Sequence, residues 1–327
     1  MSGVAKRAND ALSINPNVFH YPDSSNINLT THGSDWYWAV TGVMAVSTLA
    51  FMGLSIRVPR KNRIFHYITA SITLVASIAY FTMASNLGYA AIQVEFQRSN
   101  PKVAGLYREI FYVRYIDWFV TTPLLLLDLL LTAGLPWPTV VYTILMDEVM
   151  VITGLVGALV ASSYKWGYFV FAMLALIFIA YNVCYVGLQH AKFHGGPVKK
   201  VYTICGVWTI FLWFIYPIAW GLCEGGNVIS PDSEAVFYGV LDILAKPVFG
   251  ALLIFGHRNI DPASLGLHLK DYDDSNQVIE KDGSRANNGN NGVANNGALQ
   301  HGNVNVDGAN DVAPASTGVH NNTANMA

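Results

Sequence analysis

Two ionisable residues one helical turn apart stand inside a long apolar run. Residues 241–246 have the sequence LDILAK, and the apolar run around them covers residues 235–255. A run of this length can cross a bilayer as a helix. A lysine in the middle of such a helix costs about 2.5–3.5 kcal/mol on insertion. Lys246 therefore requires a partner or a function.

Asp242 and Lys246 admit two interpretations. At positions i and i+4 their side chains share a helix face and can form a purely structural ion pair. A buried lysine can also lose its proton and become a nucleophilic amine, which is how lysines form Schiff bases with carbonyl compounds. This stretch alone leaves the ion pair and the Schiff base open.

A second group of ionisable residues lies in residues 114–128, RYIDWFVTTPLLLLD. Asp117 and Asp128 are eleven positions apart, so in a helix they return to nearly the same face, about 16 Å apart along the axis. Arg114 lies about one turn before Asp117 on that face. Charges along one face are typical of intramembrane proton relays, and the alternative is a set of structural pairs. Spaced acids on two helices together with a mid-membrane lysine favour the relay.

Three further acids need separate interpretation. Asp147 lies in the next apolar stretch, where Thr122 can donate a hydrogen bond to it, and a structural role is favoured. Glu224 and Glu234 lie in and just after the loop before the last apolar run. Taken alone, these two glutamates are expected to be solvated loop charges.

An aromatic stripe occupies the apolar run before that loop. Trp213, Tyr216 and Trp220 share one helix face by their i, i+3, i+7 spacing. Such a stripe is usually packing, but a ring-shaped apolar ligand would need walls of this kind.

The composition indicates a membrane protein. Of 327 residues, 53% are hydrophobic and 12% are charged, against about 25% charged in soluble domains. The net charge of −2 and the lack of a basic stripe exclude a nucleic-acid partner. Cys184, Cys205 and Cys223 lack metal-ligand spacing, so we predict small buried apolar side chains and no metal site. The polar start of the chain lacks the features of a cleaved signal peptide.

Seven apolar stretches predict an all-α membrane protein, a seven-transmembrane helix bundle. They cover approximately residues 36–56, 64–92, 109–132, 137–161, 166–189, 201–222 and 232–256. Residues 36–258 are thus the membrane domain, and residues 1–35 an irregular extracellular tail. Residues 259–327, rich in Asn and Gly from residue 284 onward, are predicted to be a largely disordered cytosolic tail.

The basic residues of the loops predict the orientation. Eight lie on the side of the odd-numbered helix exits, namely Arg57, Arg60, Lys61, Arg63, Lys192, Lys199, Lys200 and Arg258. Four lie on the other side, namely Arg98, Lys102, Arg108 and Lys165. Because cytosolic loops carry the excess of Lys and Arg, the N-terminus is predicted to lie outside and the C-terminus in the cytosol.

At this point the sequence resembles the microbial-type (type 1) rhodopsins, most of all the fungal proton-pumping rhodopsins. The resemblance rests on RYIDWFVTTPLLLLDLLL at residues 114–131 and LDILAK at residues 241–246, supported by WTIFLWFIYPIAW at 208–220 and TGLVGAL at 153–159. It covers about residues 36–258. It implies a photoactive ion transporter rather than an enzyme, placed in the lipid bilayer of the plasma membrane and handling protons. A homo-oligomer is left open.

The resemblance implies all-trans retinal covalently bound to Lys246 as a protonated Schiff base. Asp117 and Asp242 would be counterions, with Asp117 also the proton acceptor, and Asp128 would be the cytosolic proton donor. The other implied proton-path residues are Arg114 (gating), Glu224 and Glu234 (proton release), Thr69 (partner of Asp128) and Tyr80 (near Asp242). The implied pocket residues are Trp118, Thr121, Thr122, Leu125, Met150, Gly154, Phe169, Trp213, Tyr216, Pro217, Trp220 and Ala245. Phe169 stands where many relatives have a tryptophan against the ring.

The implied function is a light-driven outward proton pump. Chloride-pumping relatives replace the acid at position 117 with a small polar residue, whereas this chain keeps Asp117 and Asp128. One alternative is a fungal photosensory rhodopsin with little net transport. Another is a non-photochemical, chaperone-like opsin-related protein. Lys246 argues against the latter, because proteins of that kind lack the lysine.

Overall fold

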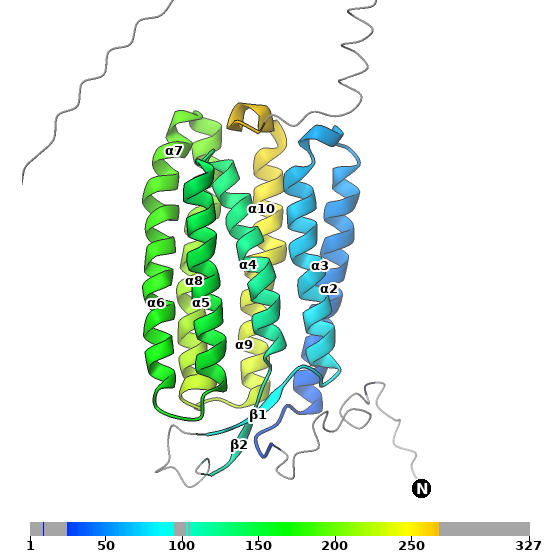
Figure 1. Cartoon of the computed structure of the whole chain (residues 1–327). Coiled ribbons are helices and arrows are strands. Elements are labelled where there is room, and N and C mark those ends of the chain that lie inside the picture. The colour runs from blue at the N-terminus through cyan, green and yellow to red at the C-terminus, as the bar shows by residue number, and fades with distance from the viewer. Residues whose placement is uncertain (1–8, 10–24, 95–102, 104, 268–327) are drawn as a thin grey trace, which may run out of the picture. The chain divides into compact units, whose positions relative to one another are not determined.

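Long apolar helices stand side by side in the computed structural model (Figure 1), which describes residue 9, residues 25–94, residue 103 and residues 105–267. These described residues contain seven helical spans long and apolar enough to cross a membrane. The predicted seven-helix all-α membrane bundle is therefore confirmed. Most of the expected N-terminal tail 1–35 and of the expected C-terminal tail 259–327 lies outside the described residues, as do the loop residues Arg98 and Lys102.

The first four spans are single α-helices. They are α2 (Thr31–Ser55), α3 (Ile64–Ala84), α4 (Val113–Thr132) and α5 (Trp137–Leu159). A short 3-10 turn, Arg60–Asn62, lies between α2 and α3.

Each of the last three spans contains a π-helical segment. The fifth runs through α6 (Lys165–Tyr181), the π segment Asn182–Gly187 and α7 (Leu188–Phe193). The sixth is α8 (Gly196–Trp220) and the π segment Gly221–Gly225. The seventh is α9 (Pro231–Ile243), the π segment Leu244–Val248, α10 (Phe249–Gly256) and the 3-10 turn His257–Asn259, followed by a further 3-10 turn, Pro262–Leu265.

The second predicted span, residues 64–92, is wrong beyond Ala84. The helix ends there because Asn86 and Gly88 adopt positive φ angles of 58° and 75°, which cannot continue a right-handed helix. The chain instead forms β1 (Ala90–Gln93), paired antiparallel with β2 (Tyr107–Ile110). Because Tyr107–Ile110 belong to β2, the third helix begins at Val113 rather than at residue 109. We call the end of the bundle that carries this hairpin the hairpin end, and the opposite end the tail end (Figure 1).

The first helix begins inside the segment that was predicted to be an irregular tail. Thr30 is its N-cap, and its side-chain oxygen accepts a hydrogen bond from the backbone N–H of His32. The backbone N–H of Thr30 in turn donates to Asp232 Oδ1 at 2.8 Å, at the start of α9. Residues 31–35 are therefore helical, because the cap and the contact with α9 fix the first turn.

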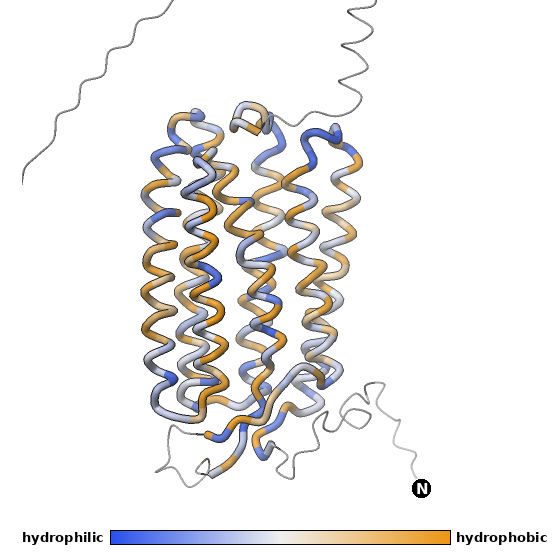
Figure 2. Tube along the Cα trace, viewed as in Figure 1, coloured by the Kyte–Doolittle hydropathy of each residue, from blue (hydrophilic) through white to orange (hydrophobic). Residues whose placement is uncertain are grey.

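The outer surface of the bundle is apolar, as a membrane protein requires. Figure 2 shows hydrophobic residues along the helices and many hydrophilic residues in the connections at both ends. Large side chains such as Leu49, Phe171 and Leu174 are exposed on this surface. Cys184, which we predicted to be buried, is also exposed, whereas Cys205 and Cys223 are buried.

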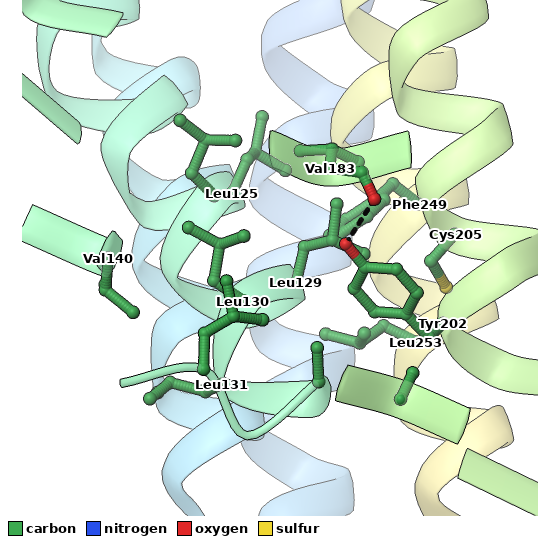
Figure 3. Packing of buried hydrophobic residues seen from close by; sticks show 14 of the residues in the cluster. Leu125, Leu129, Leu130, Leu131, Val140, Val183, Tyr202, Cys205, Phe249 and Leu253 are labelled. Carbon is green, nitrogen blue, oxygen red and sulfur yellow. Dashed lines mark hydrogen bonds between the residues drawn. The ribbon is translucent and has the colours of Figure 1, made fainter. Parts of the chain in front are cut away.

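The interior of the tail-end half is packed with leucines of α4 and residues of α8 and α10 (Figure 3). Tyr202 donates a hydrogen bond to the carbonyl oxygen of Val183 at 2.7 Å, within the π segment of the fifth span. A Cβ atom at Gly187 would lie 1.9 Å from the Tyr202 hydroxyl. Glycine at position 187 is therefore needed for α8 to approach this segment.

A buried glutamate joins the hairpin to the segment before α2. Glu109, in β2, accepts a hydrogen bond from the backbone N–H of Leu29 at 2.7 Å, and the backbone N–H of Glu109 donates to the carbonyl of Ile27 at 3.1 Å. Burial raises the pKa of Glu109 from 4.5 to about 7, although the Leu29 hydrogen bond acts in the opposite direction. Its carboxyl therefore titrates near neutral pH.

This raised pKa predicts a pH-dependent stability. Between pH 4.5 and 7 the folded state binds more protons at Glu109 than the unfolded state, so the free energy of unfolding falls as the pH rises through this window. The loss amounts to roughly 3 kcal/mol. Replacing Glu109 by Gln should remove this dependence, as measured by thermal unfolding midpoints at pH 4.5 and 7.5. An identical pH dependence in both proteins would contradict the assignment.

Candidate functional site

Lys246 lies in the π segment Leu244–Val248, at an interruption of the seventh span. Pro247 has no backbone N–H and so cannot continue the α-helical hydrogen-bond ladder. The indole N–H of Trp208 donates to the carbonyl of Leu244 at 2.9 Å and so pairs a carbonyl in this distorted turn. Such π segments are frequent at functional sites in helices. The side chain of Lys246 is buried.

Two carboxylates from different helices flank the lysine. The Lys246 Nζ lies 2.6 Å from Asp117 Oδ2 of α4 and 3.1 Å from Asp242 Oδ1 of α9. The sequence interpretation of an i, i+4 partner accounted only for Asp242. The nearer carboxylate belongs to Asp117, which the fold brings from 129 residues away.

The hydrogen-bond partners of the two carboxylates differ. Tyr80 donates to Asp242 Oδ2 at 2.6 Å, and Tyr216 donates to Asp242 Oδ1 at 2.6 Å. In contrast, Asp117 Oδ1 is buried without a hydrogen-bond partner in the described part of the chain. Both oxygens of Asp242 are therefore occupied by hydroxyl donors, while Asp117 has an oxygen free to receive a proton.

An apolar cavity extends from Lys246 into the bundle. Its space not occupied by atoms, including its opening, is about 770 Å³. Of the pocket residues expected from the sequence, the structure places in its wall Trp118, Thr122, Leu125, Met150, Gly154, Phe169, Trp213, Tyr216, Pro217, Trp220, Ala245 and Lys246. Asp242, expected from the sequence as a counterion, also lies in the wall, and residues there that the sequence did not suggest are Tyr115, Val151, Ala172, Met173 and Leu176. The side chains of these residues reach the cavity because of the rotation of each helix about its axis, which the sequence does not specify.

Thr121 does not line this cavity. Its hydroxyl donates to the backbone carbonyl of Asp117 at 2.8 Å, one turn earlier in α4. Thr121 thus caps a backbone group next to the acid.

Phe169 stacks on Trp220 at one side of the cavity, with ring centroids 5.2 Å apart and an interplanar angle of 29°. Trp166 packs edge-on against both rings, at 5.6 Å from Phe169 and 5.7 Å from Trp220. The phenyl ring therefore forms the cavity wall and the Trp166 indole supports it from one turn away.

Asp128 lies in α4 toward the tail end, away from the lysine. Its Oδ2 accepts a hydrogen bond from Thr69 at 3.0 Å, and its Oδ1 is buried without a partner among the described residues. No described cation forms an ion pair with this carboxyl. A buried carboxyl without a cation is held neutral, because ionisation would place an uncompensated charge in an apolar interior.

Asp147 of α5 is the remaining acid in the middle of the bundle. Thr122 donates to its Oδ2 at 2.7 Å, as the sequence suggested. The same hydroxyl oxygen also lies 2.8 Å from the carbonyl oxygen of Trp118, so its single hydrogen goes to one of these two acceptors at a time. This contact links α4 to α5 beside the cavity.

Arg114, Glu224 and Glu234 meet at the hairpin end. The Arg114 Nη1 lies 2.7 Å from Glu234 Oε1 and 3.3 Å from Glu224 Oε1. Both glutamates are buried, so the interpretation as solvated loop charges is wrong. The π segment Gly221–Gly225 prolongs the sixth span and turns Glu224 inward, while Glu234 lies in the first turn of α9.

Other members of this cluster were missed by sequence reasoning. Arg108 of β2 lies 2.6 Å from Glu234 Oε2, and Lys165 donates to the backbone carbonyl of Glu224 at 2.8 Å. Both had been counted only as loop charges. Three tyrosines also bind the cluster: Tyr37 accepts from Arg114 at 2.9 Å, and Tyr115 and Tyr238 each donate to Glu224 at 3.1 Å. No sequence spacing identifies these contacts, since they join six different segments, namely α2, β2, α4, α6, the π segment Gly221–Gly225 and α9.

Comparison with known proteins agrees with this arrangement. Residues 31–260 match the family model described as bacteriorhodopsin-like protein. The chain is 63% identical over 286 residues to the opsin-like protein carO of Fusarium fujikuroi, covering 85% of this chain and 93% of that protein. It is similar in structure to two light-driven proton pumps. Rhodopsin CsR of Coccomyxa subellipsoidea has 39% identity and a TM-score of 0.67, covering 70% of this chain and 99% of the other. LR (Mac) of Leptosphaeria maculans has 38% identity and a TM-score of 0.67, covering 73% and 100%.

Proposed function

The chain belongs to the bacteriorhodopsin-like family of membrane-embedded retinal proteins, and from this premise we propose that it is a light-driven outward proton pump. The observation that carries the proposal is the difference between the two carboxylates at Lys246. Asp242 is fixed by two tyrosine hydroxyls, whereas Asp117 lies nearer to the nitrogen and has a free oxygen. A proton can therefore leave Lys246 for one defined acceptor.

The residues around the cavity fit all-trans retinal bound to Lys246 as a Schiff base. Aromatic walls and an apolar interior suit a polyene with a ring, and a buried amine supplies the covalent link. Asp117 and Asp242 compensate a cationic nitrogen. When bound, retinal supplies light absorption and an isomerisation that changes the proton affinity and direction of the attached nitrogen.

The proposed path follows α4 from the tail end to the hairpin end. Asp117 receives the proton of the Lys246 nitrogen, and Asp128 supplies the replacement from the other side. Leu125 lines the cavity and also packs in the leucine cluster around Asp128, which excludes water between the two acids at rest. Arg114 with Glu224 and Glu234 offers the site of release.

The outward direction follows from the predicted orientation. The hairpin end carries the release cluster, and the excess of basic residues in the loops of the tail end predicts that the hairpin end lies outside. Lys165 and Arg108, two of the four basic residues assigned to that side, are bound to the cluster and are not free loop charges. Protons entering at the tail end would then leave the cell.

The experiment that tests the function is expression with all-trans retinal, followed by illumination of unbuffered cells. We expect a visible pigment, acidification of the medium in light, and loss of that signal with a protonophore. A pigment that moves no protons would favour the photosensory alternative.

Replacing Asp128 by Asn should slow reprotonation of the Lys246 nitrogen about 100-fold, because the variant carries no proton to donate. The absorption maximum should change little, since Asp128 is not in the cavity wall. Flash photolysis measures both. Asp147→Asn is the matched control, because Asp147 is another buried aspartate bonded to a threonine. It should slow reprotonation of the Lys246 nitrogen far less. An unaltered reprotonation rate in Asp128→Asn would show that Asp128 is not the proton donor.

A further inference from the structure

A buried histidine lies at the tail end between three helices and has no part in the path described so far. His257 follows α10 and is 8% exposed. Its ring lies against Phe65 of α3, with centroids 4.2 Å apart and an interplanar angle of 31°. On its other side it reaches Thr132, the last residue of α4, with 3.1 Å between Nε2 and Oγ1. His257 thus connects the tail end of the bundle to the helix that carries Asp128.

The hydrogen-bond partners of the His257 ring determine which of its nitrogens carry a hydrogen. The His257 Nδ1 lies 2.8 Å from the carbonyl oxygen of Leu253, which can only accept, so Nδ1 carries a hydrogen. The Thr132 hydroxyl donates to the backbone carbonyl of Asp128 at 2.7 Å. Its single hydrogen cannot also go to Nε2. With that bond made, Nε2 must be the donor and the ring is an imidazolium; with the hydroxyl turned to Nε2, the ring is neutral.

The carboxyl of Asp128 lies one helical turn from this hydroxyl, and no hydrogen bond joins the two in the structure. Thr132 and Asp128 are four residues apart, so their side chains are neighbours on one helix face. The Asp128 Oδ1 is buried and has no hydrogen-bond partner in the described part of the chain. A change of the Asp128 side-chain rotamer toward the tail end can bring this free oxygen to the hydroxyl, whose hydrogen then turns from the Asp128 backbone carbonyl to the carboxylate.

On the premise of the proposed pump, we propose that His257 is the residue through which Asp128 regains its proton from the tail end. His257 first takes a proton from solvent and becomes an imidazolium. The Nε2–H bond then breaks as its proton moves to Thr132 Oγ1, while the Thr132 hydroxyl proton moves to an Asp128 carboxylate oxygen. His257 and Thr132 end neutral and Asp128 ends protonated, so charge and protons balance.

The surrounding groups suit proton entry at this point. His66 of α3 interacts electrostatically with His257, and its buried Nδ1 has no hydrogen-bond partner among the described residues. The positive charge of Arg63 interacts electrostatically with His66, and Arg258 follows His257 in the chain. α8 contributes Tyr202 and Cys205 to the packed cluster beneath. No described carboxylate forms an ion pair with His257, so nothing there holds the proton on an imidazolium.

The test replaces His257 by Gln in the full-length pigment. An amide can keep hydrogen bonds to Leu253 and Thr132 but cannot pass a proton on. We expect recovery of the protonated Asp128 carboxyl, followed by its infrared C=O band, to slow at least about tenfold at pH 7. Proton uptake, followed with a pH dye, should slow in parallel. Donation from Asp128 to the Lys246 nitrogen should keep its rate, and added imidazole should restore the recovery.

The control is His190→Gln, at a half-buried histidine of α7 near the same end, which should behave as the wild type. Recovery at the wild-type rate in His257→Gln would overturn the inference while leaving the pump intact, and so would slow recovery that imidazole fails to restore. If the variant forms no pigment, the wild type labelled with ¹⁵N-histidine decides. Histidine ring bands should change together with the Asp128 band, and their absence would overturn the inference. A coloured wild type without proton transport would instead refute the proposed function on which the inference rests.

Discussion

Lys246→Ala should abolish the pigment completely. The substitution removes the only described amine that reaches the cavity wall, so retinal has no attachment point. Visible absorption of the purified protein after incubation with all-trans retinal measures the effect. Lys192→Ala, at an exposed lysine of α7 bonded to Gln189, is the matched control and should give a normal pigment.

Loss of colour alone could reflect misfolding, because the variant leaves Asp117 and Asp242 without their cation in a buried site. A second measurement on the wild type avoids this ambiguity. Borohydride reduction of the pigment followed by proteolysis and mass spectrometry should find the retinyl group on the peptide that contains Lys246. A retinyl group on another lysine, or a coloured Lys246→Ala product, would refute the linkage.

The second large effect is expected from Asp117→Asn. The amide cannot take a proton from the Lys246 nitrogen, so light-driven acidification should fall at least about 100-fold. The absorption maximum should move to longer wavelength, because the cationic nitrogen loses the carboxylate at 2.6 Å that stabilises its resting charge. Absorption spectra and pH changes in illuminated cells measure the two effects. Asp35→Asn, at an exposed aspartate of α2, should leave both unchanged.

Replacement of Asp242 should have a different effect. Asp242→Asn also shifts the absorption, but it should retain transfer of the proton to Asp117, since the acceptor oxygen is still present. If Asp117→Asn pumped normally and Asp242→Asn did not, the assignment of acceptor and fixed counterion would have to be reversed.

The sequence by itself determined the class of protein and the helices that carry the chemistry. Seven apolar stretches were readable because lipid leaves a backbone no alternative to internal hydrogen bonding. Asp117, Asp128 and Lys246 were recognisable because an ionisable side chain is costly in such a stretch and therefore conspicuous. Their individual roles were suggested only by resemblance to a family.

The tertiary structure decided what depends on contacts between distant segments. It ended the second span at Ala84, because Asn86 and Gly88 turn the chain into a hairpin. It buried Glu224 and Glu234 around Arg114 and brought Arg108 to them, although each had the appearance of a loop charge. It also showed which acid lies nearest to Lys246 and which is tied to tyrosines. Spacing along one helix cannot supply this information, since proton transfer depends on distances between helices whose rotation and π segments are fixed only by packing.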